Sequence, residues 1–167
     1  ATAPTARPAC VGWKLLPGNA MNLVYIVLAH KNPEQVVRLV HRLNTGTSTF
    51  LIHLDSQMAP SAYAETVAGL ESLDNVLYLP RLHAYWGGWP IMEVTLQALQ
   101  WIVARQIPCD YAVLLSGQCY PLVPNATIRV RLEAAQGRSL LDHFPLPNAC
   151  WPEGGMNRIE KWHFRLG

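Results

Sequence analysis

The sequence predicts an α/β fold with a mainly parallel sheet flanked by helices, and three observations support this prediction. Apolar runs of β type alternate with segments of helical periodicity from about residue 22 to residue 141. The helical segments are about 10–15 residues long, which is typical of right-handed βαβ crossovers. Half of the 167 residues are apolar and only 14% are charged, enough for a sizeable core and too apolar for a disordered chain.

The first half of the chain carries five element signals in order. A continuous apolar run predicts a strand over 23–28, and Pro33 is well placed to begin a helix that ends near Leu43. The next elements are a strand over 49–54, a helix over about 60–70 and a strand over 75–79. The two longer strands end in polar residues, His30 and Asp55.

The second half continues the alternation and then loses it. A long helix with apolar residues from 91 to 103 follows the loop 81–88, and a strand is expected over 111–115. A helix near 126–135, capped by Gly137, leads to a short strand over 139–141, and prolines and glycines dominate from Pro145 onward. We therefore expect an irregular lead-in over 1–20 and one α/β domain part over 21–167.

Composition excludes several classes of protein. The net charge is +2 and there is no basic run, so nucleic acid is not an expected partner. No run reaches the roughly 18 apolar residues of a membrane helix. The four cysteines form no CxxC pair, which argues against a structural zinc site and leaves open one or two disulfides.

Most of the candidate binding residues follow the carboxyl ends of the predicted strands. Parallel sheets bind ligands at this edge, and here it carries His30, Asp55, the loop 83–88 and the segment 116–118. A nucleotide needs an apolar wall, a carboxylate or backbone groups for the ribose, and N–H groups for phosphate. Trp86-Gly87-Gly88, just before a helix, could supply such N–H groups.

Other interpretations of these residues remain open. Asp55 could simply cap the next segment, and His53, inside a strand, is more typical of a buried core histidine than of a ligand. Together with His30 they could form a two-histidine, one-carboxylate iron site of an oxygenase. Ser116 lacks the glycine two residues earlier that a hydrolase nucleophile elbow needs, and neither a phosphate loop nor GxGxxG occurs.

Four segments in order resemble one family. They are Tyr25–Gln35, Ile52–Asp55, Trp86–Gly88 and Leu114–Leu122, and as a set they resemble the core-2/I-branching enzymes, the β-1,6-N-acetylglucosaminyltransferases related to peptide-O-xylosyltransferases. The resemblance covers roughly residues 22 to 165.

The resemblance implies a GT-A type nucleotide-sugar fold and inverting transfer from a UDP-sugar to a hydroxyl acceptor on a glycan or glycoprotein. It implies that the enzyme uses no metal and no other cofactor. Consistent with this expectation, the sequence contains no Asp-x-Asp pair. In a eukaryote such an enzyme would be a Golgi membrane protein, with an anchor outside this chain, and in a bacterium it would be cytoplasmic. The alternative function is a non-catalytic nucleotide- or sugar-binding module.

Residue by residue, the resemblance assigns donor contacts to three places and an acceptor contact to one. The donor residues are Leu28, Ala29, His30, Asp55, Ser56, Gln57 and Trp86; the acceptor residue is Arg158. Cys119 stands where the family usually carries an acid. The family's catalytic glutamate would lie beyond Gly167, so we expect a fragment with no catalytic residue of its own.

Overall fold

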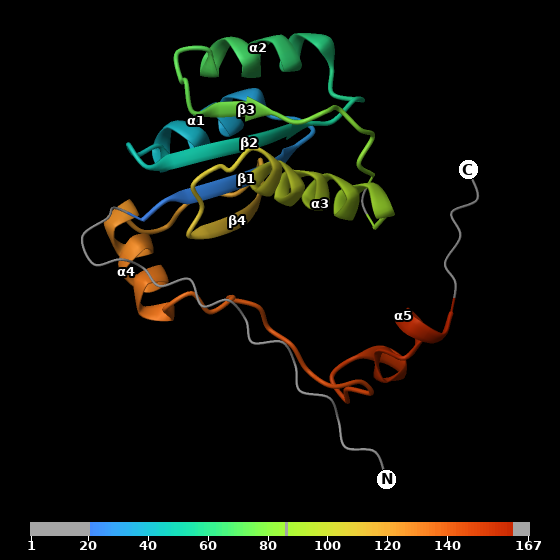
Figure 1. Ribbon diagram of the computed structural model, residues 1–167. Coiled ribbons are helices and arrows are strands. Elements are labelled where there is room, and N and C mark those ends of the chain that lie inside the picture. The colour runs from blue at the N-terminus through green and yellow to red at the C-terminus, as the bar shows by residue number, and fades with distance from the viewer. Residues whose placement is uncertain (1–20, 86, 162–167) are drawn as a thin grey trace. The chain divides into compact units, whose positions relative to one another are not determined.

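The computed structural model describes residues 21–85 and 87–161, which fall into two compact units divided after Gly137. The first unit contains a four-stranded parallel sheet in the order β3-β2-β1-β4 (Figure 1). Its strands are β1 (Leu23–Ala29), β2 (Ser48–Leu54), β3 (Val76–Tyr78) and β4 (Tyr111–Ser116). Its helices are α1 (Pro33–Leu43), α2 (Pro60–Leu70), α3 (Trp89–Ala104) and α4 (Asn125–Ala135). The predicted α/β fold is confirmed.

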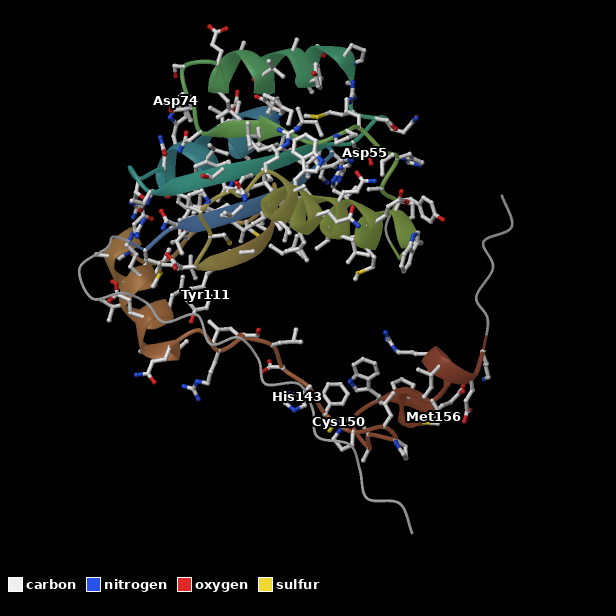
Figure 2. The ribbon with its side chains drawn as sticks, in the orientation of Figure 1. Asp55, Asp74, Tyr111, His143, Cys150 and Met156 are labelled. Atoms are coloured by element: carbon white, nitrogen blue, oxygen red, sulfur yellow. The ribbon has the colours of Figure 1, made fainter. Side chains whose placement is uncertain are left out.

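Strand β1 occupies the centre of the sheet because nearly all of its residues are apolar and buried. Leu28 is in register with His53 of β2 on one side and with Ser116 of β4 on the other. The carboxyl ends of three strands therefore lie level at one edge. Figure 2 shows Asp55 at this edge and Asp74 at the opposite end of the sheet.

Helices cover both faces of the sheet, and strand alternation decides which side chain meets which helix. Tyr25, Val27 and Phe50 pack with the apolar residues of α1, α2 and α4. The alternate residues Val24 and Ile26 pack with Val94 and Ala98 of α3. At about 25 cal/mol per Å² of apolar surface, these two clusters supply the main stabilisation of the fold.

Helix α3 also carries an exposed apolar stripe. We call the following set the α3 stripe: Trp89, Met92, Leu96, Leu99 and Val103. Their spacing of three or four residues places them along one side of the helix. Leu114 of the edge strand β4 is 52% exposed as well, although its register partner Ile26 is buried. Such a continuous apolar surface is unusual for an isolated globular unit.

Two sequence expectations differ from the structure. Residues 139–141 form no strand, and Leu140 and Leu141 are 69% and 79% exposed, so they gain nothing from sheet pairing. Helix α4 ends at Ala135, and the left-handed conformation already begins at Gln136, with φ 50°, one residue before Gly137. The expected lead-in over 1–20 lies outside the described residues.

The second unit contains only short elements among its described residues. A 3₁₀ helix η1 (Pro152–Gly155) and a single-turn helix α5 (Asn157–Glu160) follow a cis peptide bond before Pro147. Phe144 and Trp151 pack edge to face, with ring centroids 5.2 Å apart. Across the parts of the chain that the structure describes, no helix is both long and apolar enough to span a bilayer.

Candidate functional site

A cleft of about 790 Å³ lies at the carboxyl edge of the sheet. It is formed by the ends of β1, β2 and β4, by the loop after β3 and by the start of α3. The lining residues are Leu28, Ala29, His30, His53, Asp55, Gln57, His83, Ala84, Tyr85, Ile91, Leu114, Leu115, Ser116 and Gln118. This volume falls within the range of small-molecule sites, about 300–1,000 Å³.

The end of β1 forms one side of the cleft, and the glycine directly after β4 lies close against it. Leu28 is half-buried, Ala29 is buried and His30 is exposed. The amide of Gly117 donates to the carbonyl of Leu28 at 2.8 Å. A Cβ at position 117 would lie 2.7 Å from the Cβ of Ala29, so only glycine lets β4 end this close to β1.

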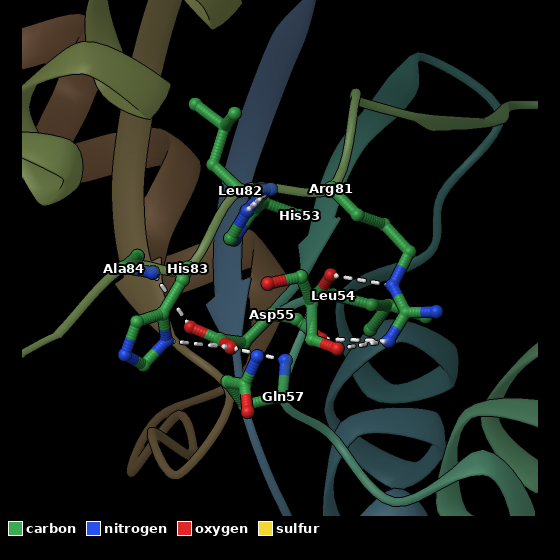
Figure 3. Close-up of polar contacts among 9 residues, drawn as sticks. His53, Leu54, Asp55, Gln57, Arg81, Leu82, His83 and Ala84 are labelled. Atoms are coloured by element: carbon green, nitrogen blue, oxygen red, sulfur yellow. Dashed lines mark hydrogen bonds and ion pairs between the residues drawn. The ribbon is translucent and has the colours of Figure 1, made fainter.

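The carboxylate of Asp55 is buried and already hydrogen-bonded (Figure 3). Its Oδ1 accepts the amide of Gln57 at 2.7 Å, and its Oδ2 accepts the amide of Ala84 at 2.7 Å. Burial raises the pKa of Asp55, but these two amides and the nearby His83 ring more than offset it and bring the pKa below its ordinary value. Asp55 therefore carries a negative charge into the cleft and also fixes the local backbone.

His53 lies two residues earlier on the same face of β2 and is 1% exposed. Its Nε2 accepts the amide of Leu82 at 3.1 Å, which requires an unprotonated nitrogen at that position. Burial lowers the pKa of His53. The prediction of a hydrogen-bonded core histidine is confirmed, and the same bond occupies Nε2, one of the two ring nitrogens through which a histidine can bind a metal ion.

The loop after β3 forms the facing wall of the cleft. His83 places Nδ1 at 3.4 Å from Oδ1 of Asp55, and its ring lies 5.8 Å from that of Tyr85. Across the cleft, the hydroxyl of Ser116 accepts the amide of Gln118 at 3.2 Å. Aromatic and imidazole groups thus face apolar side chains with a carboxylate between them, which suits a base and a ribose.

The structure brings together most of the residues that the sequence assigned to the donor. Leu28, Ala29, His30, Asp55 and Gln57 all line the cleft. Ser56 is not among the lining residues; its amide donates to the carbonyl of Leu82 and its own carbonyl accepts Arg81. Trp86 lies outside the described residues.

Arg158, assigned to the acceptor, belongs to the second unit. Its guanidinium carbon lies 4.2 Å from the centroid of the Trp151 ring, a cation–π contact that holds the side chain in place. Glu153, in the same unit, forms an exposed ion pair with Lys161 at 2.8 Å.

Sequence reasoning missed Arg81. From the loop, its guanidinium donates to the carbonyls of Leu54, Asp55 and Ser56 at 2.8–3.3 Å and stacks on the Tyr63 ring. A single arginine after a proline carries no signal for such a role, because its partners are backbone carbonyls.

Within the described residues, no group of three or more His, Cys, Asp or Glu side chains is arranged to hold a metal ion. The iron-site hypothesis built on His30, His53 and Asp55 therefore finds no support in their geometry. Cys109, Cys119 and Cys150 are free thiols, so no disulfide joins any two of these three.

Comparison with known proteins adds an independent observation. A sequence model described as core-2/I-branching enzyme matches residues 23–159. A human N-acetyllactosaminide beta-1,6-N-acetylglucosaminyl-transferase is 26% identical over 146 residues, which cover 86% of this chain and 35% of that protein. A human beta-1,3-galactosyl-O-glycosyl-glycoprotein beta-1,6-N-acetylglucosaminyltransferase is 23% identical over 145 residues, covering 86% and 32%. The chain thus spans about a third of the length of these curated relatives.

Proposed function

The chain belongs to the core-2/I-branching enzyme family, and from that membership we propose that it forms the donor-binding part of an inverting, metal-independent glycosyltransferase. The reaction would move N-acetylglucosamine from a UDP-sugar to a hydroxyl group. Relatives named for N-acetyllactosaminide and for galactosyl-O-glycosyl-glycoprotein suggest a glycan or glycoprotein acceptor. The observation that carries the proposal is the cleft at the carboxyl edge of the sheet, which family membership and strand topology both point to.

The lining of the cleft fits a nucleotide in two ways. Leu28, Ile91 and Leu114 give an apolar surface on which a pyrimidine ring can lie. Asp55 is a negatively charged acceptor for ribose hydroxyls, since a carboxylate has about four acceptor sites and two are taken by amides. The imidazole of His30, exposed at the rim, is a hydrogen-bonding group for the same ligand.

The proposed chemistry is direct displacement at the anomeric carbon. A carboxylate would take the proton of the acceptor hydroxyl as that oxygen attacks, and the UDP oxygen would leave with the bonding electrons. Cationic side chains would stabilise the leaving diphosphate, because the sequence has no Asp-x-Asp pair to bridge a metal. The residues of this chain bind and orient the donor, and we assign the base to none of them.

Calorimetry tests the proposal directly. UDP titrated into the 167-residue chain in the presence of EDTA should bind, and ADP should bind more weakly. His30→Ala should weaken UDP binding about three- to tenfold, the effect of losing one hydrogen bond. Lys31→Ala is the matched control, because Lys31 is the exposed neighbour and does not line the cleft.

Four outcomes contradict the proposal in different ways. Absence of UDP binding removes the nucleotide site, and equal binding of ADP and UDP removes its pyrimidine specificity. Binding that EDTA abolishes would refute metal independence. A full-length protein that contains this chain, binds UDP and transfers no N-acetylglucosamine would favour the non-catalytic binding module.

A further inference from the structure

The loop between β3 and α3 stays attached to β2 after the backbone ladder has ended. The last ladder-type bond runs from the amide of Leu79 to the carbonyl of Ile52 at 2.9 Å. From Arg81 to Ala84 the chain has no strand geometry, yet it remains hydrogen-bonded to the end of β2 (Figure 3). All but one of these later bonds have a side chain on one side, in place of a backbone group of a paired strand.

Two side chains at the end of β2 hold alternate amides of the loop. His53 lies in β2 and Asp55 directly follows the strand, two residues later, and both side chains reach the loop after β3. They accept the amides of Leu82 and Ala84, which are also two residues apart. The amide of Ser56 donates back to the carbonyl of Leu82 at 3.1 Å. The loop is thus fastened at successive points, with the spacing of a paired strand.

His53 is the neutral member of the three side chains that hold the loop. Asp55 is buried as well, but as an anion that lines the cleft, and Arg81 is exposed. The ring of His53 lies at the floor of the cleft, 1% exposed, between the sheet and the loop. An apolar residue there would leave the Leu82 amide without its acceptor, and an unpaired buried amide is costly.

We infer that His53 is a positioning residue for donor binding: its Nε2 holds the loop over residues 81–85 against β2, so that His83, Ala84 and Tyr85 form the cleft wall before a ligand enters. The inference rests on the proposed function in taking the ligand to be a UDP-sugar. A wall that is already in place saves the ordering cost that a mobile loop would add to binding.

Two substitutions at position 53 distinguish the loss of the hydrogen-bond acceptor from the loss of the side chain that fills the site. His53→Leu fills the site without an acceptor, whereas His53→Gln places an amide oxygen near the position of Nε2. His41→Leu is the matched control, since His41 is an exposed histidine of α1 whose Nε2 lies 3.1 Å from the carbonyl oxygen of Gly69, away from the cleft. Each variant is measured by hydrogen exchange at the Leu82 amide and by calorimetry with UDP.

His53→Leu should speed exchange of the Leu82 amide about tenfold and weaken UDP binding about five- to tenfold, the range of one buried hydrogen bond. His53→Gln should restore most of both, and His41→Leu should change neither. Central β1 amides such as that of Val27 should keep their protection in every variant. If His53→Leu proves unfolded by circular dichroism, Leu82→Pro removes the same bond from the loop side.

Hydrogen exchange and UDP affinity test different parts of the inference. Equal exchange at Leu82 in the wild type and His53→Leu would overturn the fastening role of His53. Faster exchange with unchanged UDP affinity would overturn its role in donor binding. If the wild type does not bind UDP, the proposed function fails, and the exchange data still decide whether His53 holds the loop.

Discussion

At the scale of single residues, the site depends on two buried groups whose charge states differ. The Asp55 carboxylate stays ionised because two amides donate to it, and His53 stays neutral because it is buried. An ionised carboxylate and a neutral imidazole nitrogen both accept hydrogen bonds. Here both accept them from backbone amides of the same loop. The carboxylate can also receive a ligand, whereas the imidazole nitrogen is fully used.

The lowered pKa of His53 predicts a pH dependence of stability. As pH falls below the ordinary value of 6.5, the unfolded chain takes up the proton before the folded one does. The stabilisation is therefore complete above pH 6.5 and is lost as pH falls toward the folded pKa. Nearby Asp55 and Arg81 act on this pKa in opposite directions. Wild-type Tm should drop more steeply between pH 7 and about pH 5 than that of His53→Gln.

The same melting series contains its control. His41→Gln removes an exposed histidine, so its curve should run parallel to that of the wild type. Parallel curves for His53→Gln and wild type would mean that His53 titrates normally and is not held neutral by the fold.

Asp55→Asn tests whether Asp55 supports UDP binding by contacting the ligand or by holding the loop in place. The amide side chain has one acceptor oxygen, so one of the two backbone amides loses its partner. We expect a loss of about 1–3 kcal/mol in the free energy of unfolding and weaker UDP binding. Urea unfolding measures the first and calorimetry the second. Unchanged stability together with weaker UDP binding would make Asp55 a ligand contact alone.

At the scale of elements, the junction of β4 with β1 depends on Gly117. Gly117→Ala would place a methyl group 2.7 Å from the Cβ of Ala29 and 3.0 Å from Cγ2 of Val36. Overpacking of this kind costs about 1–3 kcal/mol, and it would push the end of β4 away from the cleft. Gly46→Ala is the matched control, since nothing lies within 4 Å of its added Cβ. Chemical denaturation of both variants gives the comparison, and equal stability would contradict the close approach.

A helix or strand can be predicted from sequence when its packing against the core imposes a periodic pattern of apolar residues on it. Strands 23–28 and 49–54 and their helices were predicted almost to the residue, because apolar periodicity reports burial directly. Leu140 and Leu141 look like a strand but remain exposed, since a strand also needs a neighbour that the sequence does not specify.

The site was predicted in part for the same reason. Strand ends mark the edge of a parallel sheet, so topology made Asp55 and His30 candidates, and the family resemblance then assigned them to the donor. The partner of His53 is a backbone amide 29 residues away, and any residue other than proline would supply it. Contacts made through the backbone leave no residue type to recognise, which is why the fastening of the loop could not be predicted.

At the scale of the whole molecule, the α3 stripe and Leu114 leave six apolar side chains between 41% and 78% exposed. We predict that the 167-residue chain binds a hydrophobic dye and self-associates at concentrations of about 10–100 μM. The double variant Leu96→Glu, Val103→Lys should reduce both effects without changing the net charge. Sedimentation velocity measures the association.

The control for the stripe is the double variant Ala64→Glu, Ala134→Lys, two exposed changes on α2 and α4 that also keep the net charge. It should leave association as in the wild type. A wild-type chain that stays monomeric over the whole concentration range would show that exposed side chains of α3 do not attract one another.

The hydrogen bonds that hold the loop also affect how the residues lining the cleft can change in evolution. His53 and Asp55 hold positions 82 and 84 by their amides, so the wall is placed without reference to the side chains it displays. The side chains at 83, 84 and 85 can then change while these two backbone contacts remain, with proline forbidden at 84. A lineage could exchange imidazole, methyl or phenol groups facing the ligand and inherit the same wall position each time. Ligand preference would change by point mutation, while the loop that carries it stays where β2 puts it.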